Sequence, residues 1–116
     1  MVIDQQELDR VFAALSDATR RDMLAQLSAG ERNIGSLAER YRISQPAVSK
    51  HVRVLERAGL VTSYRRGRQS FLRVNTEPMD QARGWISYYT QFWKRQFNAV
   101  DEYLRRSETG EREDGT

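Results

Sequence analysis

Apolar residues recur along most of the chain at spacings of three and four, which place them on one face of a helix. Capping residues mark several helix starts, such as Asp4 and Ser44, the latter followed by a proline suited to the first turn. Gly30 and Gly59 mark two of the ends. The predicted helices run from about Gln5 to Leu15, from a cap at Ser16 or Asp17 to Gly30, from Asn33 to Tyr41, from Ser44 to Gly59 and from Thr76 to about Arg106.

The pattern changes between residues 60 and 74, where β-branched and aromatic residues alternate with polar ones. Leu60–Tyr64 and Ser70–Val74 are predicted strands, and Gly67 between them suits a tight turn. Before this hairpin, a short link at Arg42-Ile43 separates two predicted helices. The order predicts a mainly α fold with a small β-hairpin, a winged helix-turn-helix.

Length and composition limit what else the chain contains. The 116 residues have room for one domain, which we place at residues 1–106, and residues 107–116 are polar enough to predict a disordered tail. No apolar run approaches the roughly 20 residues that span a membrane, and the acidic start differs from a signal peptide, so we expect a cytoplasmic protein. The absence of cysteine excludes disulfides and thiolate metal sites.

Positive charge is concentrated in one stretch of the chain. From Arg42 to Asn75 there are eight basic residues and one acid, Glu56, a net charge of +7, whereas the whole chain carries +3. A basic stretch is often only a solvated surface, but this one coincides with the predicted helix-turn-helix and hairpin. The coincidence favours a polyanionic partner, double-stranded DNA.

The second helix of the helix-turn-helix has two faces. Val48, Val52 and Leu55 share one side, which predicts a core face. The other side carries short polar and cationic residues, a pattern typical of a helix that enters a major groove, where Gln and Ser read base edges and cations contact phosphates. The DNA-binding candidates on this helix are Ser44, Gln45, Ser49, Lys50, Arg53 and Arg57.

The hairpin tip is a second candidate contact with DNA. Arg65, Arg66 and Arg68 surround Gly67, where a wing can follow the phosphate backbone or enter the minor groove. The alternative is an ordinary exposed turn kept soluble by charge. We favour DNA contact because no acid occurs between Arg57 and Glu77.

Two segments resemble the ArsR/SmtB family of bacterial transcriptional repressors. They are FAALSDATRR, from Phe12 to Arg21, and SLAERYRISQPAVSKHVRVLERAGLV, from Ser36 to Val61. The resemblance covers nearly the whole predicted domain and implies a homodimer that binds palindromic operators and is released by an effector. It also implies that Gln45, Ser49 and Lys50 face DNA, with His51 as a further candidate.

His51 has two interpretations of similar weight. It borders the apolar stripe of its helix, so it is either a partly buried structural histidine or a phosphate contact.

The chain departs from the family at its metal sites. The positions that correspond to the family's paired cysteines are Asn33 and Gly35, and the one histidine lies on the predicted DNA-binding helix rather than the last helix. Asp101 and Glu102 are better explained as solvated acids than as ligands. We therefore predict no metal, no cofactor and membership of the branch without the metal-binding cysteines; the effector stays unknown.

The last helix carries an apolar seam with a period close to 3.5. A chain this small has little core to cover such a seam, so the prediction is pairing with a second copy around a two-fold axis, helped by the first helix. The predicted dimer interface comprises Leu8, Phe12, Met79, Ala82, Trp85, Ile86, Tyr89, Trp93, Phe97, Val100 and Leu104. The alternative, less favoured because aromatic stripes are more often core, is an effector pocket lined by Trp85, Tyr88, Tyr89, Phe92 and Trp93.

These features predict a sequence-specific DNA-binding regulator, a dimeric repressor of an inverted-repeat operator. The alternatives are a winged-helix protein interaction module and a non-specific DNA-binding protein. An enzyme is not expected, because one histidine, no cysteine and no Gly-rich phosphate loop leave no catalytic arrangement.

Overall fold

Side-chain caps determine where the first four helices begin. Asp4, Asp17, Asn33 and Ser44 each accept a hydrogen bond from a backbone N–H of the following turn, which satisfies a donor that the helix itself cannot. The four predicted starts are confirmed, and the second helix uses Asp17 rather than Ser16.

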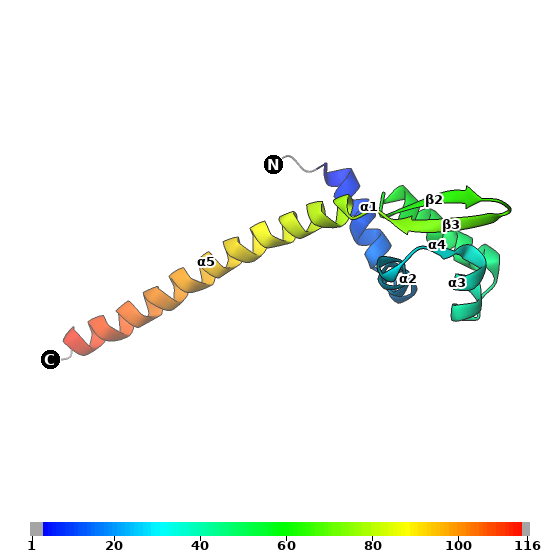
Figure 1. Cartoon of the computed structure of the whole chain (residues 1–116). Coiled ribbons are helices and arrows are strands. Elements are labelled where there is room, and N and C mark those ends of the chain that lie inside the picture. Colours follow the sequence, from blue (N-terminus) through cyan, green and yellow to red (C-terminus); the bar gives the residue numbers. More distant parts are fainter. Residues whose placement is uncertain (1–3, 115–116) are drawn as a thin grey trace. The chain divides into compact units, whose positions relative to one another are not determined.

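The computed structural model describes the backbone of residues 4–114 and the side chains of residues 4–108. Its elements in chain order are α1 (Gln5–Leu15), α2 (Ala18–Ala29), β1 (Arg32–Asn33), α3 (Ile34–Tyr41), α4 (Gln45–Arg57), β2 (Val61–Arg66), β3 (Gln69–Val74) and α5 (Glu77–Asp114) (Figure 1). The mainly helical winged helix-turn-helix fold is confirmed, with α3 and α4 as the helix-turn-helix.

The turn between α3 and α4 is closed by an unusual backbone conformation. Arg42 has φ 53°, in the left-handed region, and its N–H reaches the carbonyls of Ala38 and Glu39. This ends α3 in the manner of a C-terminal cap and lets the chain reverse within the few residues before the Ser44 cap.

The wing is a three-stranded antiparallel sheet in the order β1-β3-β2. Tyr64 lies opposite Phe71 in the hairpin, and Gly67 at its tip has φ 64°, so the predicted turn is confirmed. β1 was not predicted, because two residues are too few to show an alternating pattern. It pairs Asn33 with Phe71 and so joins the start of α3 to the wing.

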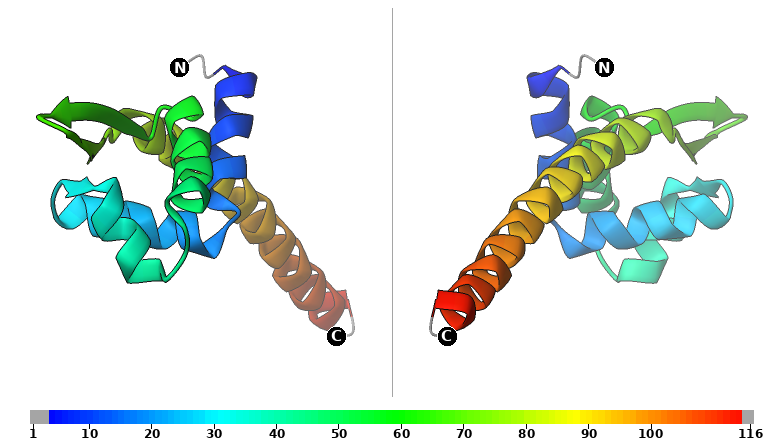
Figure 2. Two further views of the ribbon diagram at one scale, coloured as in Figure 1. Left: turned by 90° about the vertical axis from the view of Figure 1, so that its right-hand side faces the viewer. Right: turned by 90° about the vertical axis from the view of Figure 1, so that its left-hand side faces the viewer.

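The core lies where α1, α2, α3, α4 and the sheet meet. Figure 2 shows α1 and α4 side by side. The largest fully buried side chains are Met23, Leu37, Leu55, Leu60, Leu72 and Val48. Two residues predicted at the dimer interface, Leu8 and Ala82, are 4% and 2% exposed and belong to this core. Their apolar character therefore serves the fold of the single chain and leaves almost no surface for a partner.

The chain divides into two compact units, Met1–Ala82 and Arg83–Thr116. In the second unit α5 continues to Asp114, past the predicted end near Arg106. The predicted tail therefore overlaps this helix at residues 107–114, and residues 115–116 lie outside the described part; the disorder of the tail stays a prediction. The tail's composition excludes a core, but it includes no proline, so nothing in it forces the helix to stop. The division into a domain of residues 1–106 and a tail stays a prediction.

Within the described part of the chain, no helix is both long enough and apolar enough to cross a membrane.

Candidate nucleic-acid interface

α4 has the two faces that its sequence predicts. Val48, Val52 and Leu55 are buried, whereas the predicted DNA-binding side chains of this helix remain accessible to different degrees. Ser44, Gln45, Lys50, Arg53 and Arg57 are exposed, and Ser49 and His51 are half-buried. The Ser44 hydroxyl accepts from the N–H of Ala47 at 3.2 Å, so this residue also fixes the start of the helix.

The N-terminal part of α4 and the wing share a hollow of about 410 Å³. Gln45 and Ser49 meet Arg68 of the hairpin there. The full lining is Asn33, Ile34, Gly35, Gln45, Ser49, Arg68, Gln69 and Ser70. The structure thus brings two predicted base-reading residues together with one predicted wing contact.

Sequence reasoning missed the remaining polar residues of this hollow. Asn33, Gln69 and Ser70 enter it because β1 pairs with β3, a long-range contact without a local signal. Gly35 lies close to the amide of Gln45: a Cβ there would lie 3.7 Å from Nε2, an ordinary van der Waals distance. A larger side chain at position 35 would project toward the amide that we expect to read a base.

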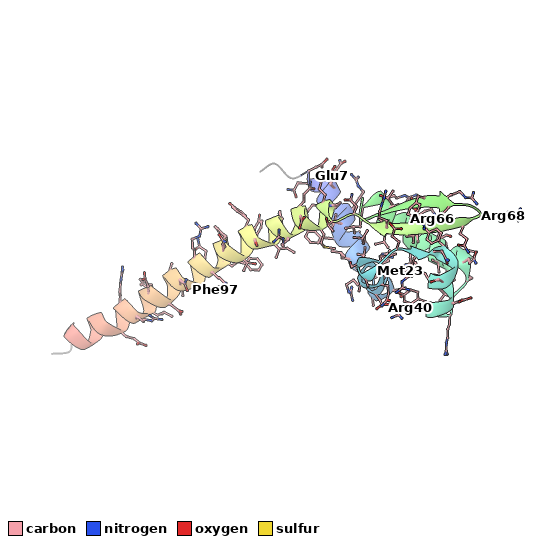
Figure 3. The ribbon with its side chains drawn as sticks, in the orientation of Figure 1. Glu7, Met23, Arg40, Arg66, Arg68 and Phe97 are labelled. Atoms are coloured by element: carbon pink, nitrogen blue, oxygen red, sulfur yellow. The ribbon has the colours of Figure 1, made fainter. Side chains whose placement is uncertain are left out.

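Arg65, Arg66 and Arg68 of the hairpin are all exposed, and Arg66 and Arg68 differ in their surroundings. The Arg66 guanidinium lies over the rings of Phe71 and Tyr64, 5.4 and 6.0 Å from their centroids. These rings stack on each other with centroids 5.8 Å apart. Figure 3 shows Arg66 on the hairpin and Arg68 at its tip. Of the two, Arg68 lines the hollow with Gln45, whereas Arg66 packs on an aromatic face of the wing.

A second cation reinforces this aromatic face. Arg73 lies 5.5 Å from the centroid of the Tyr64 ring. The Tyr64 hydroxyl donates to the Glu31 carboxylate, which raises the pKa of the Tyr64 phenol. The pattern follows from the alternation of side chains across a sheet, since Tyr64, Arg66 and their partner Phe71 share one face.

Arg57 lies at the other end of α4, away from this hollow. It lines a separate cavity of about 250 Å³ that also includes Glu7, Arg10 and Glu77. Its neighbourhood therefore contains acids as well as bases, unlike the surroundings of Gln45.

His51 packs its Nδ1 edge against α2. Nδ1 lies 3.3 Å from an Arg20 guanidinium nitrogen and 3.9 Å from an Asp17 carboxylate oxygen. The backbone N–H of Arg20 is the main cause that lowers the pKa of Asp17, with further lowering by the charge of the Arg20 guanidinium. About a quarter of the His51 side chain, 24%, stays exposed.

Among the residues that the structure describes, no three histidine or carboxylate side chains gather as metal ligands.

Helix, turn, two-faced helix and basic wing together define the class of winged helix-turn-helix DNA-binding proteins. A family described as a helix-turn-helix domain matches residues 15–64. The transcriptional repressor SdpR of Bacillus subtilis is 33% identical over 79 residues, which cover 68% of this chain and 88% of SdpR. The chain belongs to the ArsR/SmtB family of winged helix-turn-helix transcriptional repressors, which are DNA-binding regulators rather than enzymes.

Solved structures agree with this assignment. An ArsR-like transcriptional regulator from Rhodococcus matches with a TM-score of 0.74 and 33% identity, covering 84% of this chain and 92% of its own. The solution structure of a homodimeric winged helix-turn-helix DNA-binding domain from Mycobacterium bovis, a possible ArsR-family regulator, matches with a TM-score of 0.61 and 25% identity. The match covers 79% of this chain and 83% of that one.

Proposed function

We propose that this protein is a dimeric, sequence-specific repressor that binds an inverted-repeat operator in double-stranded DNA. The observation that carries the proposal is the hollow in which Gln45 and Ser49 of α4 meet Arg68 of the wing. A helix in the major groove needs short polar side chains at its N-terminal end, and an adjacent arginine can grip the phosphate backbone.

Each side chain has a role that follows from its chemistry. Gln45 can make paired hydrogen bonds to an adenine edge, and the Ser49 hydroxyl can donate or accept at several bases. Lys50 and Arg53 are exposed on the same helix and suit phosphate contacts, which set register without reading sequence. Such a function also implies a cytoplasmic protein, because the DNA that it would bind lies in the cytoplasm.

The proposed dimer rests on the apolar residues of α5. Large apolar side chains cover this helix yet are exposed in the single chain: Ile86, Tyr88, Tyr89, Phe92, Trp93, Phe97, Val100, Tyr103 and Leu104. Soluble proteins rarely leave so continuous an apolar strip uncovered. The homodimeric neighbour from Mycobacterium bovis supports a second copy as the covering partner. A two-fold dimer presents two α4 helices to half-sites one DNA turn apart, roughly 34 Å.

The aromatic residues of α5 already contact one another. The rings of Trp85 and Tyr89 have centroids 4.4 Å apart, and Trp93 meets Tyr89 edge-on at 6.4 Å. Such ring pairs stabilise a packed surface, and we therefore favour the dimer seam over an effector pocket. A selective small-molecule stabilisation lost on Trp85→Ala would favour the pocket instead.

The test begins with selection of bound fragments from a random DNA pool at physiological salt. The proposal expects one enriched sequence with two-fold symmetry, bound by two chains. Purified Gln45→Ala should then lose the preference for this sequence over random DNA while it still binds DNA. Equal binding of all fragments would favour a non-specific DNA-binding protein, and no binding would favour a protein interaction module.

A further inference from the structure

Arg20 joins three helices of the DNA-binding unit. Its guanidinium donates to the carbonyls of Ala14 and Ala13 at the end of α1, at 2.8 and 3.0 Å. From α2 it also approaches Nδ1 of His51 on α4, at 3.3 Å. One side chain therefore links the end of α1 to the helix that carries the base-reading residues.

The contact between Arg20 and His51 determines which ring nitrogen carries the proton. A guanidinium can only donate, so Nδ1 must accept from Arg20 and must itself be unprotonated. The Asp17 carboxylate oxygen lies 3.9 Å from Nδ1, beyond hydrogen-bond distance, and it already accepts from the backbone N–H of Arg20 at 3.0 Å. The neutral imidazole then carries its proton on Nε2.

The Nε2–H group is left as an available donor. Of the hydrogen bonds that the structure describes, the one to Arg20 is the sole bond of this ring and involves Nδ1. Among the described residues, every buried side-chain nitrogen or oxygen has a hydrogen-bond partner. Nε2 has no described partner, so it is not buried and is accessible to solvent. His51 directly follows Lys50 in the sequence, on the helix that we expect to enter the major groove of DNA.

We propose that Arg20 is a positioning residue for DNA binding, which holds His51 neutral with its proton on Nε2 so that this N–H donates to a DNA phosphate oxygen. The inference rests on the proposed function for its DNA contact. The tautomer itself is a property of the free protein and is tested separately. Because the same guanidinium binds the α1 carbonyls, it also fixes the ring relative to the first helix.

The tautomer can be read directly, because His51 is the only histidine in the chain. A long-range nitrogen–proton NMR spectrum of the full-length protein should contain one imidazole pattern, that of a protonated Nε2 and an unprotonated Nδ1. Arg20→Gln should convert this pattern to a tautomer mixture. Arg21→Gln is the matched control, since Arg21 donates to the Leu15 carbonyl at 2.7 Å and makes no described contact with His51.

Two substitutions of His51 separate its two nitrogens. In His51→Asn the side-chain oxygen keeps an acceptor near the place of Nδ1, whereas in His51→Gln the amide nitrogen keeps a donor near the place of Nε2. We expect His51→Asn to weaken operator binding about 10-fold and His51→Gln to retain more of the affinity. Thermal unfolding of each variant identifies any loss that is only structural.

The salt dependence of binding tests whether the ring is neutral on DNA. A neutral donor releases no counterion, so His51→Asn should leave the slope of log affinity against log salt unchanged, whereas Lys50→Gln should reduce it by about 1. A reduced slope for His51→Asn, a protonated Nδ1 in the NMR spectrum, or full affinity of folded His51→Asn would each overturn the inference. Wild-type selectivity for an operator is measured independently, so failure here is distinct from failure of the proposed function.

Discussion

The Tyr41 hydroxyl donates a hydrogen bond to the Asp22 carboxylate at 2.5 Å, joining the end of α3 to the middle of α2. The Nε of Arg40 reaches the same carboxylate oxygen at 3.4 Å. α3 is short, and its neighbour in the helix-turn-helix carries the base-reading residues. This contact therefore helps to hold the whole motif against the rest of the fold.

The pair predicts a loss of stability at alkaline pH. Burial, with the hydrogen bond to Asp22, raises the pKa of Tyr41 to about 12, above its ordinary value of 10.0. A group with a raised pKa contributes to the free energy of unfolding fully at pH values below its pKa in the unfolded chain. This contribution is lost as pH rises through its pKa in the folded protein. Urea unfolding should therefore show wild type more stable than Tyr41→Phe at pH 8, with the difference shrinking between pH 10 and 12.

The Asp22 carboxylate of the same pair predicts a loss of stability at acidic pH. The hydrogen bond from Tyr41 lowers the pKa of Asp22 below 3.8, so its contribution is present above that value and is lost as pH falls through the folded pKa. The advantage of wild type over Tyr41→Phe should also shrink below pH 4. A difference that stays constant from pH 3 to 12 would contradict the hydrogen bond.

Two glycines with positive φ should respond differently to alanine. Gly67 at the hairpin tip has φ 64°, and no atom lies within 4 Å of the place that a Cβ would take there. Gly59 has φ 73°, and a Cβ there would lie 3.3 Å from Pro78. The left-handed backbone alone costs about 1 kcal/mol for a side chain. Gly67→Ala should lose about that much, and Gly59→Ala more, by chemical denaturation. Equal losses would mean that Pro78 moves aside freely.

Base reading and phosphate contact should separate by mutation. Ser49→Ala should lower the preference for operator over random DNA by about 1 kcal/mol or more, because a base-edge contact is lost. Arg68→Ala should weaken both complexes alike and reduce the salt slope by about 1. Binding isotherms at several salt concentrations measure both. A Ser49 variant with unchanged preference would remove this residue from the readout.

A charge on the α5 seam should dissociate the dimer. Val100 is 55% exposed and lies in the middle of the apolar stripe across its width. Asn98 is also exposed but lies on the opposite side of the helix. Figure 3 shows Phe97 in the same region of α5. Sedimentation should find Val100→Glu as a monomer with weakened operator binding and Asn98→Glu as a dimer. If both variants stay dimeric, the seam does not form the interface.

Much of this molecule follows from local sequence. The caps at Asp4 and Ser44, the helix start at Asn33 and the turn at Gly67 depend on residues within a few positions, so the pattern alone predicts them. For the second helix the pattern narrows the cap to Ser16 or Asp17, and the structure decides for Asp17. The two faces of α4 follow in the same way from helical geometry. The family resemblance added the expectation that the exposed face binds DNA.

The contacts that arrange the site required the tertiary structure. The Arg20–His51 contact, the Tyr41–Asp22 bond and the β1–β3 pairing each join residues far apart in the chain, so no local period reveals them. The packing of the wing beside α4 likewise decides that Arg68 lines the same hollow as Gln45. Local sequence determines the helices and the two hairpin strands because those choices depend on near neighbours, whereas β1 forms only by pairing with β3. Packing alone decides which polar side chains meet, since their partners arrive from distant parts of the chain.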